Sequence, residues 1–263
     1  MTVYFIGAGP GAADLITVRG ARTLAACQVC LYAGSLVPKE LLAECPPGAR
    51  LVDTADLDLD AIERELVAAH EAGHDVARLH SGDPSVFSAV AEQMRRLDAH
   101  GVPYEVVPGV PAFAAAAAAL KRELTVPTVG QTVILTRIAQ QATPMPAGED
   151  LATLGASGAL LVLHLGARYV DRIVGELLPH YGAECPAAVV AYASRENELV
   201  LRGTLGDIAE QVKAAGVLRT AVILVGRTLG ASQFRDSHLY STERDRASGS
   251  ESCGGRPRSS PRP

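Results

Sequence analysis

Short apolar runs alternate with segments of helical periodicity along the first half of the chain. The runs have the length and composition of buried strands, and they lie at Val3–Gly7, Val29–Tyr32, Arg50–Val52, Val76–Leu79 and Tyr104–Val107. The segments between them place apolar residues three and four positions apart, which predicts helices at Thr17–Ala26, Leu59–Ala72, Val86–His100 and Phe113–Lys121. Strands joined through helices require crossover connections, so we expect a mostly parallel sheet in this half.

A second alternation follows the segment 125–130, whose sequence Thr-Val-Pro-Thr-Val-Gly is typical of a boundary. It predicts strands at Val133–Leu135, Ala159–His164, Ala187–Ala191, Leu199–Arg202 and Ala221–Val225, and helices at Tyr169–His180 and Thr204–Ala215. We therefore expect an α/β protein with two domains, at residues 1–126 and 131–240. From residue 241 the composition changes to Ser, Gly, Pro and Arg, which predicts a disordered tail over residues 241–263.

Composition and length place the chain among ordinary globular proteins. Its 263 residues are 48% apolar and 20% charged, and a chain of this size buries a core without disulfides or structural metal. No run of about 18 apolar residues occurs, so a membrane-spanning helix is not expected. The first residues lack a basic segment and the five cysteines are an odd number, so we expect reduced thiols and a cytoplasmic location.

The charge distribution argues against nucleic acid and favours an acidic small molecule as partner. The net charge is −5, although residues 241–263 hold five arginines against three acidic residues, so the rest of the chain is more negative still. Of the basic residues only Lys39, Lys121 and Lys213 are lysines. Because arginine binds carboxylates through two parallel hydrogen bonds, the excess of arginine points to a ligand that carries carboxylates.

Three short motifs match patterns of other functions without the context that those functions need. Gly7–Ala12 follows a strand like the turn of a dinucleotide-binding fold, but the helix is delayed to about Thr17 and the second strand lacks an acidic residue to bind a ribose. His70–His74 matches the zinc-protease pattern, but Gly73 ends the helix between the two histidines. Cys27–Cys30 bridges a helix end and a strand start, where core packing is the expected role. No metal site is predicted.

Two turns rich in glycine and proline are better candidates for a site. His80–Phe87 and Val107–Ala112 each lie at the end of a predicted strand. Ligands bind at the carboxyl ends of parallel strands, so Asp83 is a candidate to accept hydrogen bonds from ligand hydroxyl groups. The alternative is that Asp83 only caps the next helix. Together with the loop after the first strand, the two turns predict a ligand site at this edge.

Five segments follow one another in a characteristic order: Tyr4–Gly11 with Leu15–Thr17, Ser81–Pro84, Val107–Gly109, Val162–Gly166 and Arg202–Leu205. Taken together they resemble the tetrapyrrole methyltransferase family, the S-adenosylmethionine-dependent enzymes of cobalamin and siroheme synthesis. The resemblance runs from about Val3 to Leu229. Three further segments resemble the branch of that family that methylates carbon 11 of precorrin-4 or its cobalt complex, namely Leu31–Val37, Leu135–Arg137 with Thr143–Glu149, and Tyr192–Ser194.

The resemblance implies a fold, a cofactor and the residues that hold the cofactor. It implies two α/β domains of the tetrapyrrole methylase type with mixed and parallel sheets, an active site in the cleft between them, and a homodimer. The cofactor would be S-adenosyl-L-methionine, with S-adenosyl-L-homocysteine as the product. By position within the family's binding segments, the cofactor contacts would be Pro10, Ser81, Gly82, Asp83, Val86, Pro111, Ala112, Leu165 and Ala193.

Two positions depart from other members of the family. Leu165 stands where relatives often have methionine, a change that conserves volume. The uroporphyrinogen methyltransferases carry an aspartate just after the tyrosine of the second strand, whereas Ala33 and Gly34 follow Tyr32 here. We therefore assign no catalytic base. Catalysis is expected to depend on positioning an activated methyl group against an electron-rich ring carbon.

The resemblance also implies a substrate with several carboxylates, which arginines that face the cleft would bind. Arg137, Arg168 and Arg195 each lie beside a motif and are the candidates, and the alternative is that they are solvated surface residues. Three other functions stay open. They are methylation of a different ring carbon, binding of S-adenosylmethionine without catalysis, and a nicotinamide-dependent enzyme.

Overall fold

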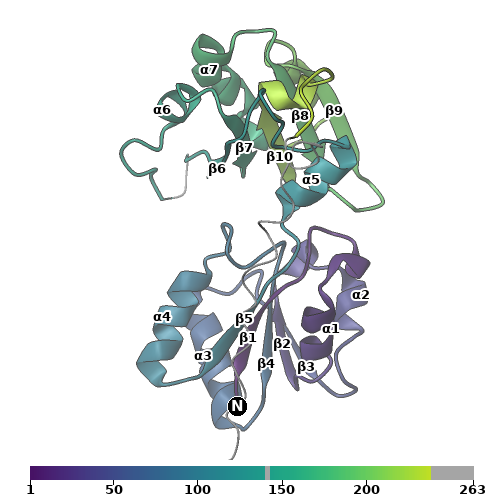
Figure 1. Cartoon of the computed structure of the whole chain (residues 1–263). Coiled ribbons are helices and arrows are strands. Elements are labelled where there is room, and N and C mark those ends of the chain that lie inside the picture. Colours follow the sequence, from purple (N-terminus) through teal and green to yellow (C-terminus); the bar gives the residue numbers. More distant parts are fainter. Residues whose placement is uncertain (140–142, 238–263) are drawn as a thin grey trace, which may run out of the picture.

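Two five-stranded sheets lie one above the other in the computed structural model, which describes residues 1–139 and 143–237 (Figure 1). The first sheet has the order β3-β2-β4-β1-β5, and all of its neighbouring strands are parallel, as predicted. Its strands are β1 Val3–Gly7, β2 Val29–Tyr32, β3 Arg50–Asp53, β4 Val76–His80 and β5 Tyr104–Val107. The predicted disordered tail at 241–263 lies outside the described residues.

Helices cover both faces of the first sheet, which explains why the inner strands β1, β2 and β4 are mostly apolar. On one face Val3 and Phe5 pack with α3 and α4, and on the other Ile6 and Ala8 pack with α1 and α2. The hydroxyl oxygen of Thr17 caps α1 by accepting a hydrogen bond from the Gly20 N–H at 3.0 Å. The helices are α1 Val18–Leu24, α2 Lys39–Leu42, α3 Leu59–Glu71 and α4 Val90–His100.

The second sheet is mixed. Its order is β6-β7-β10-β8-β9, in which β6 and β7 are parallel and the other pairs are antiparallel. Its strands are β6 Val133–Arg137, β7 Leu160–His164, β8 Pro186–Ala191, β9 Leu199–Thr204 and β10 Ala221–Val225. The helices α6 Leu151–Gly155, α7 Val170–Tyr181 and α8 Ile208–Ala214 pack with one face of it. The expectation of an α/β fold with parallel and mixed sheets is confirmed.

Helix α5 (Ala112–Leu120) packs on the opposite face of the second sheet, where Ala115 and Ala116 share a core with Val162 and Val222 (Figure 1). Its run of alanines lets the helix approach the strands closely. The chain therefore passes from the first sheet to the second before α5, which is N-terminal to the boundary segment 125–130. The domain limits 1–126 and 131–240 stay a prediction.

Some element boundaries differ from the sequence prediction. Helix α4 begins at Val90 rather than Val86, because Phe87 and Ala89 both have a φ of 52°, which a right-handed helix excludes. Helix α8 begins at Ile208 rather than Thr204. The four- and five-residue helices α2 and α6 were not predicted. Segments that short do not show a helical period.

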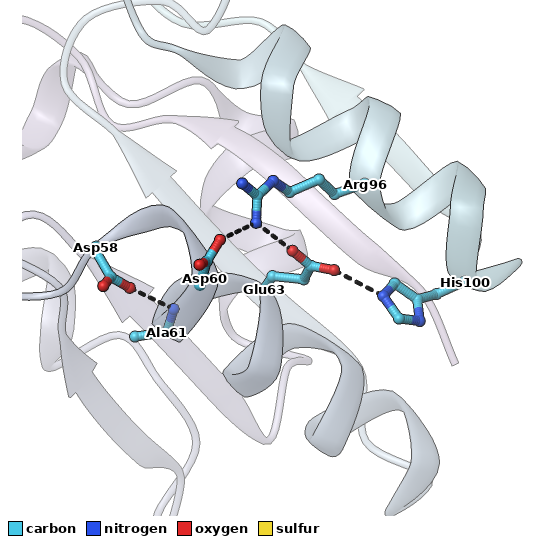
Figure 2. Close-up of polar contacts among 6 residues, drawn as sticks. All are labelled: Asp58, Asp60, Ala61, Glu63, Arg96 and His100. Carbon is cyan, nitrogen blue, oxygen red and sulfur yellow. Dashed lines mark hydrogen bonds and ion pairs between the residues drawn. The ribbon is translucent and has the colours of Figure 1, made fainter.

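Ion pairs tie α3 to α4 on the outside of the first sheet (Figure 2). Arg96 on α4 contacts both Asp60 and Glu63 on α3, and Glu63 also contacts His100 at 2.7 Å. Asp58 caps the start of α3 through its side chain. Hydrogen bonds from Arg96 and His100 lower the pKa of Glu63. None of these residues lines the cavity described below, so the cluster holds two helices together and is not part of the site.

No helix within residues 1–139 or 143–237 is long and apolar enough to cross a bilayer.

Candidate functional site

A cavity of about 420 Å³ opens between the loops of the two sheets. Its volume falls in the range of small-molecule pockets, about 300–1,000 Å³. Loops after β1 and β4 and the start of α5 form one side, and loops after β7 and before β10 form the other. The wall includes all nine positions that the family resemblance assigns to the cofactor: Pro10, Ser81, Gly82, Asp83, Val86, Pro111, Ala112, Leu165 and Ala193. That these residues bind the cofactor stays a prediction.

Three glycines make the floor of the site possible. A Cβ atom on Gly109 would lie 2.2 Å from the Gly82 oxygen and 2.7 Å from the Cα of Gly7. The loop after β1 is also bound to the loop after β4, because Gly82 donates its N–H to the Gly9 carbonyl at 2.7 Å. Gly7 and Gly109 therefore have no room for a side chain, and Gly82 has a φ of 70°, which glycine adopts without strain.

The Asp83 side chain connects the loop after β4 to the loop after β5. Its Oδ2 accepts a hydrogen bond from the Gly109 N–H at 2.7 Å, and its Oδ1 accepts one from the Ser85 N–H at 2.8 Å. The Ser85 hydroxyl also donates to Oδ1. Burial opposes ionisation of Asp83, but the hydrogen bonds from Ser85 and Gly109 outweigh it and lower the pKa. The carboxylate therefore holds the cavity wall in shape, and a direct contact with ligand stays a prediction.

We expect Asp83→Ala to lower the free energy of unfolding by about 1.5–3 kcal/mol at neutral pH, since it removes hydrogen bonds to a charged group. A depressed pKa stabilises the fold above the unfolded value near 3.9, and this stabilisation is lost as the pH falls through the folded pKa. The difference in the free energy of unfolding between wild type and Asp83→Ala should therefore become smaller at acidic pH. Urea unfolding at neutral and acidic pH measures it, with the exposed Asp171→Ala as control. Equal stability of Asp83→Ala and wild type at neutral pH would contradict this role.

Left-handed backbone conformations gather at the cavity. Residues other than glycine rarely adopt positive φ, and such strain clusters at ligand sites. The cavity lining includes Phe87 (φ 52°), Leu165 (φ 57°) and Thr220 (φ 53°), and Ala193 is flanked by Tyr192 (φ 53°) and Ser194 (φ 65°). The sequence carries no mark of these conformations, because none of these residues is a glycine.

Sequence reasoning did not select His164, Phe87 or Arg219 as site residues, and all three line the cavity. His164 at the end of β7 lines the cavity, and its ring centroid lies 5.4 Å from that of Phe87. The Nε2 atom of His164 is buried without a hydrogen-bond partner, and burial lowers the pKa of this histidine. His164 belongs to the segment Val162–Gly166, from which only Leu165 was selected. Arg219 also lines the cavity.

None of the three candidate arginines lines this cavity. Arg137 borders a second cavity of about 180 Å³, and it pairs in register with His164 on the adjacent strand. Its Nη2 donates to the Thr143 carbonyl at 2.8 Å, while its Nη1 is buried without a partner. The Nη2 of Arg195 donates to the Leu36 carbonyl at 3.1 Å, which links the two halves. Arg168 is exposed in the turn after β7. Substrate binding by these arginines stays a prediction.

The cysteine motif Cys27–Cys30 and the histidine motif His70–His74 can now be placed in the structure. Cys27 and Cys30 are buried in the core between β2 and α1, so core packing is confirmed for both. Helix α3 ends at Glu71, which leaves His74 in the turn that follows. Within the part of the chain that the structure describes, no group of three His, Cys, Asp or Glu residues is arranged to hold a metal ion.

Comparison with known proteins identifies a family and a similar relative. The family model described as Tetrapyrrole (Corrin/Porphyrin) Methylases matches residues 2–209. The precorrin-4 C(11)-methyltransferase of Rhodococcus erythropolis is 68% identical over 246 residues, which cover 94% of this chain and 99% of the relative.

Two solved structures are similar to this fold. A cobalt precorrin-4 methyltransferase superposes with a TM-score of 0.84 at 38% identity and covers 87% of this chain and 95% of its own. The uroporphyrin-III C-methyl transferase of Thermus thermophilus, complexed with S-adenosyl homocysteine, has a TM-score of 0.73 at 29% identity. The match covers 87% of this chain and 93% of the Thermus chain.

Proposed function

The chain belongs to the tetrapyrrole (corrin/porphyrin) methylase family and is a methyltransferase, and on this basis we propose that it methylates carbon 11 of precorrin-4 with S-adenosylmethionine as donor. The reaction belongs to cobalamin biosynthesis. One observation of the structure carries the proposal: a single cavity between the two halves brings together all nine positions assigned to the donor. A homodimer and a cytoplasmic location are part of the same proposal and rest on the family resemblance and the cysteine content.

The cavity fits such a donor in size and chemistry. Pro111, Ala112 and Ala193 provide a flat apolar wall, and the loop Ser81–Asp83 provides polar groups beside it. This combination of apolar surface with a few fixed polar groups is typical of cofactor sites. When bound, S-adenosylmethionine supplies a methyl group that is already activated by the positive sulfur. The related Thermus thermophilus structure holds the corresponding product, S-adenosyl homocysteine.

The work of the protein is then to position the acceptor. Large apolar side chains are exposed around the same cavity, with exposed fractions of 44% for Leu36, 67% for Leu165 and 58% for Leu218. Exposed apolar surface of this kind marks a binding site, and it suits the face of a macrocycle. Holding the attacking carbon about 3–3.5 Å from the methyl group, in line with the sulfur, accounts for many orders of magnitude in rate.

The metal-free substrate is preferred within this proposal. The relative named for precorrin-4 is 68% identical, whereas the solved cobalt precorrin-4 methyltransferase is 38% identical. Purified protein should therefore be offered metal-free and cobalt precorrin-4 with S-adenosylmethionine, and the product mass measured. We expect the metal-free substrate to gain one methyl group, and NMR with an isotope-labelled donor to place it on carbon 11. Binding of the donor without transfer to either substrate would overturn the proposal.

Arg137 is proposed to bind a substrate carboxylate, because its Nη1 is buried without a partner beside His164. We expect Arg137→Ala to raise the KM for the tetrapyrrole about tenfold or more, as for a lost hydrogen bond between charged groups. The affinity for S-adenosylhomocysteine should not change. Steady-state kinetics measures the KM and calorimetry measures the affinity for S-adenosylhomocysteine, with the exposed Arg64→Ala as control. A weaker affinity for S-adenosylhomocysteine at unchanged KM would refute this assignment.

A further inference from the structure

His164 is placed in the cavity by the alternation of strand β7. Leu160 and Val162 face the core that contains α5, and His164 is the next residue on that side of the strand. The imidazole lines the cavity, as do Val222 and Ala112. Leu165, with its φ of 57°, turns the chain away immediately afterwards and fixes the position of the histidine.

The imidazole has an apolar environment and an unused nitrogen. Its ring packs on Phe87 at 5.4 Å between centroids, and its Nε2 is buried without a hydrogen-bond partner. Native proteins rarely leave a buried polar atom unpaired, and the exceptions often have a catalytic role. Burial lowers the pKa of His164 below its ordinary range, so the ring is neutral at neutral pH and can accept a proton.

The charged groups near His164 cannot accept a proton in its place. Asp83 lines the cavity, but the hydrogen bonds from Ser85 and Gly109 lower its pKa, which makes its carboxylate a weak base. The other charged neighbours are Arg219 on the cavity wall and Arg137 in register on β6, and a guanidinium has no acceptor atom. Among the cavity-lining side chains that the structure describes, His164 is therefore the one suited to take up a proton.

We propose that His164 is a catalytic residue that contacts the tetrapyrrole and accepts the proton released when the ring carbon is methylated. This inference rests on the proposed function. The π electrons of carbon 11 form the new bond to the methyl carbon, and the electron pair of the broken carbon–sulfur bond stays on sulfur. The positive charge then lies on the pyrrole ring, whose N–H proton passes to an imidazole nitrogen of His164 and later to water.

The test compares His164→Gln, which keeps hydrogen bonding without a basic nitrogen, with wild type and with the exposed control His74→Gln. We expect kcat for His164→Gln to fall about 100-fold or more, the usual contribution of a general base. The dissociation constant of S-adenosylhomocysteine and the unfolding midpoint should stay unchanged. Wild-type kcat should decrease in acid as His164 becomes protonated, and the variant should lack this acid limb.

NMR titration of the His164 imidazole in the wild-type protein gives a second measurement that does not depend on a variant. The imidazole pKa in the complex with substrate should coincide with the acid limb of kcat. A variant that retains wild-type kcat, or an imidazole pKa that does not match the limb, would overturn the inference while leaving methyl transfer established. Absence of methyl transfer by the wild-type protein would instead reject the proposed function, and the inference with it.

Discussion

Gly109→Ala is expected to prevent the chain from folding to its native structure. The added Cβ would lie 2.2 Å from the Gly82 oxygen, 2.7 Å from the Cα of Gly7 and 2.9 Å from its carbonyl carbon. All three atoms are backbone, so no flexible side chain can move aside. Gly7 is the last residue of β1, an interior strand that lies between β4 and β5. Relieving the clash would separate the ends of these strands, which places the cost above about 4 kcal/mol.

Urea unfolding followed by circular dichroism measures this effect. The matched control is Gly175→Ala on helix α7, where a Cβ meets nothing within 4 Å. Because alanine favours a helix over glycine by about 0.5–1 kcal/mol, the control should be slightly more stable than wild type. A Gly109→Ala protein with the wild-type unfolding midpoint would show that the three loops do not meet as described.

Ala112→Trp is expected to leave the fold intact and to abolish binding of the methyl donor. Ala112 is the first residue of α5 and lines the cavity together with Leu165 and Ala193. A tryptophan there fills space that the donor needs. Inserting even a few surplus atoms into a packed space costs about 1–3 kcal/mol, so we expect affinity for S-adenosylhomocysteine to fall about 100-fold or more.

Isothermal titration calorimetry with S-adenosylhomocysteine provides the measurement. Ala118→Trp is the control, since Ala118 is exposed on the same helix and does not line the cavity. Both variants should unfold at the same urea concentration as wild type. Wild-type affinity in Ala112→Trp would mean that the donor binds elsewhere.

The sequence predicted most strands correctly, because strands buried on both faces are continuous apolar runs. β1, β2, β5 and β10 have the predicted bounds. The start of α4 could not be predicted, since the left-handed residues Phe87 and Ala89 carry no mark in the sequence. The packing of α5 on the second sheet could not be predicted either, because its alanines suit either sheet equally.

The candidate site was predicted from family segments rather than from periodicity. Those segments identified backbone loops, and the structure brings Pro10, Asp83 and Ala193 to one cavity although they are far apart in the chain. They did not identify His164, whose direction depends on strand alternation and on the turn at Leu165. The arginines were selected by their nearness to motifs in sequence; they lie outside this cavity, where Arg137 and Arg195 donate hydrogen bonds to backbone carbonyls, and their role in substrate binding stays a prediction.

A crystal structure of the protein with S-adenosylhomocysteine would show where the methyl donor binds. We expect the ligand in the cavity between the two sheets, between the loop Ser81–Asp83 and the turn at Leu165, in contact with Ala112 and Ala193. Electron density for the ligand at any other place on the protein would show that this cavity is not the donor site.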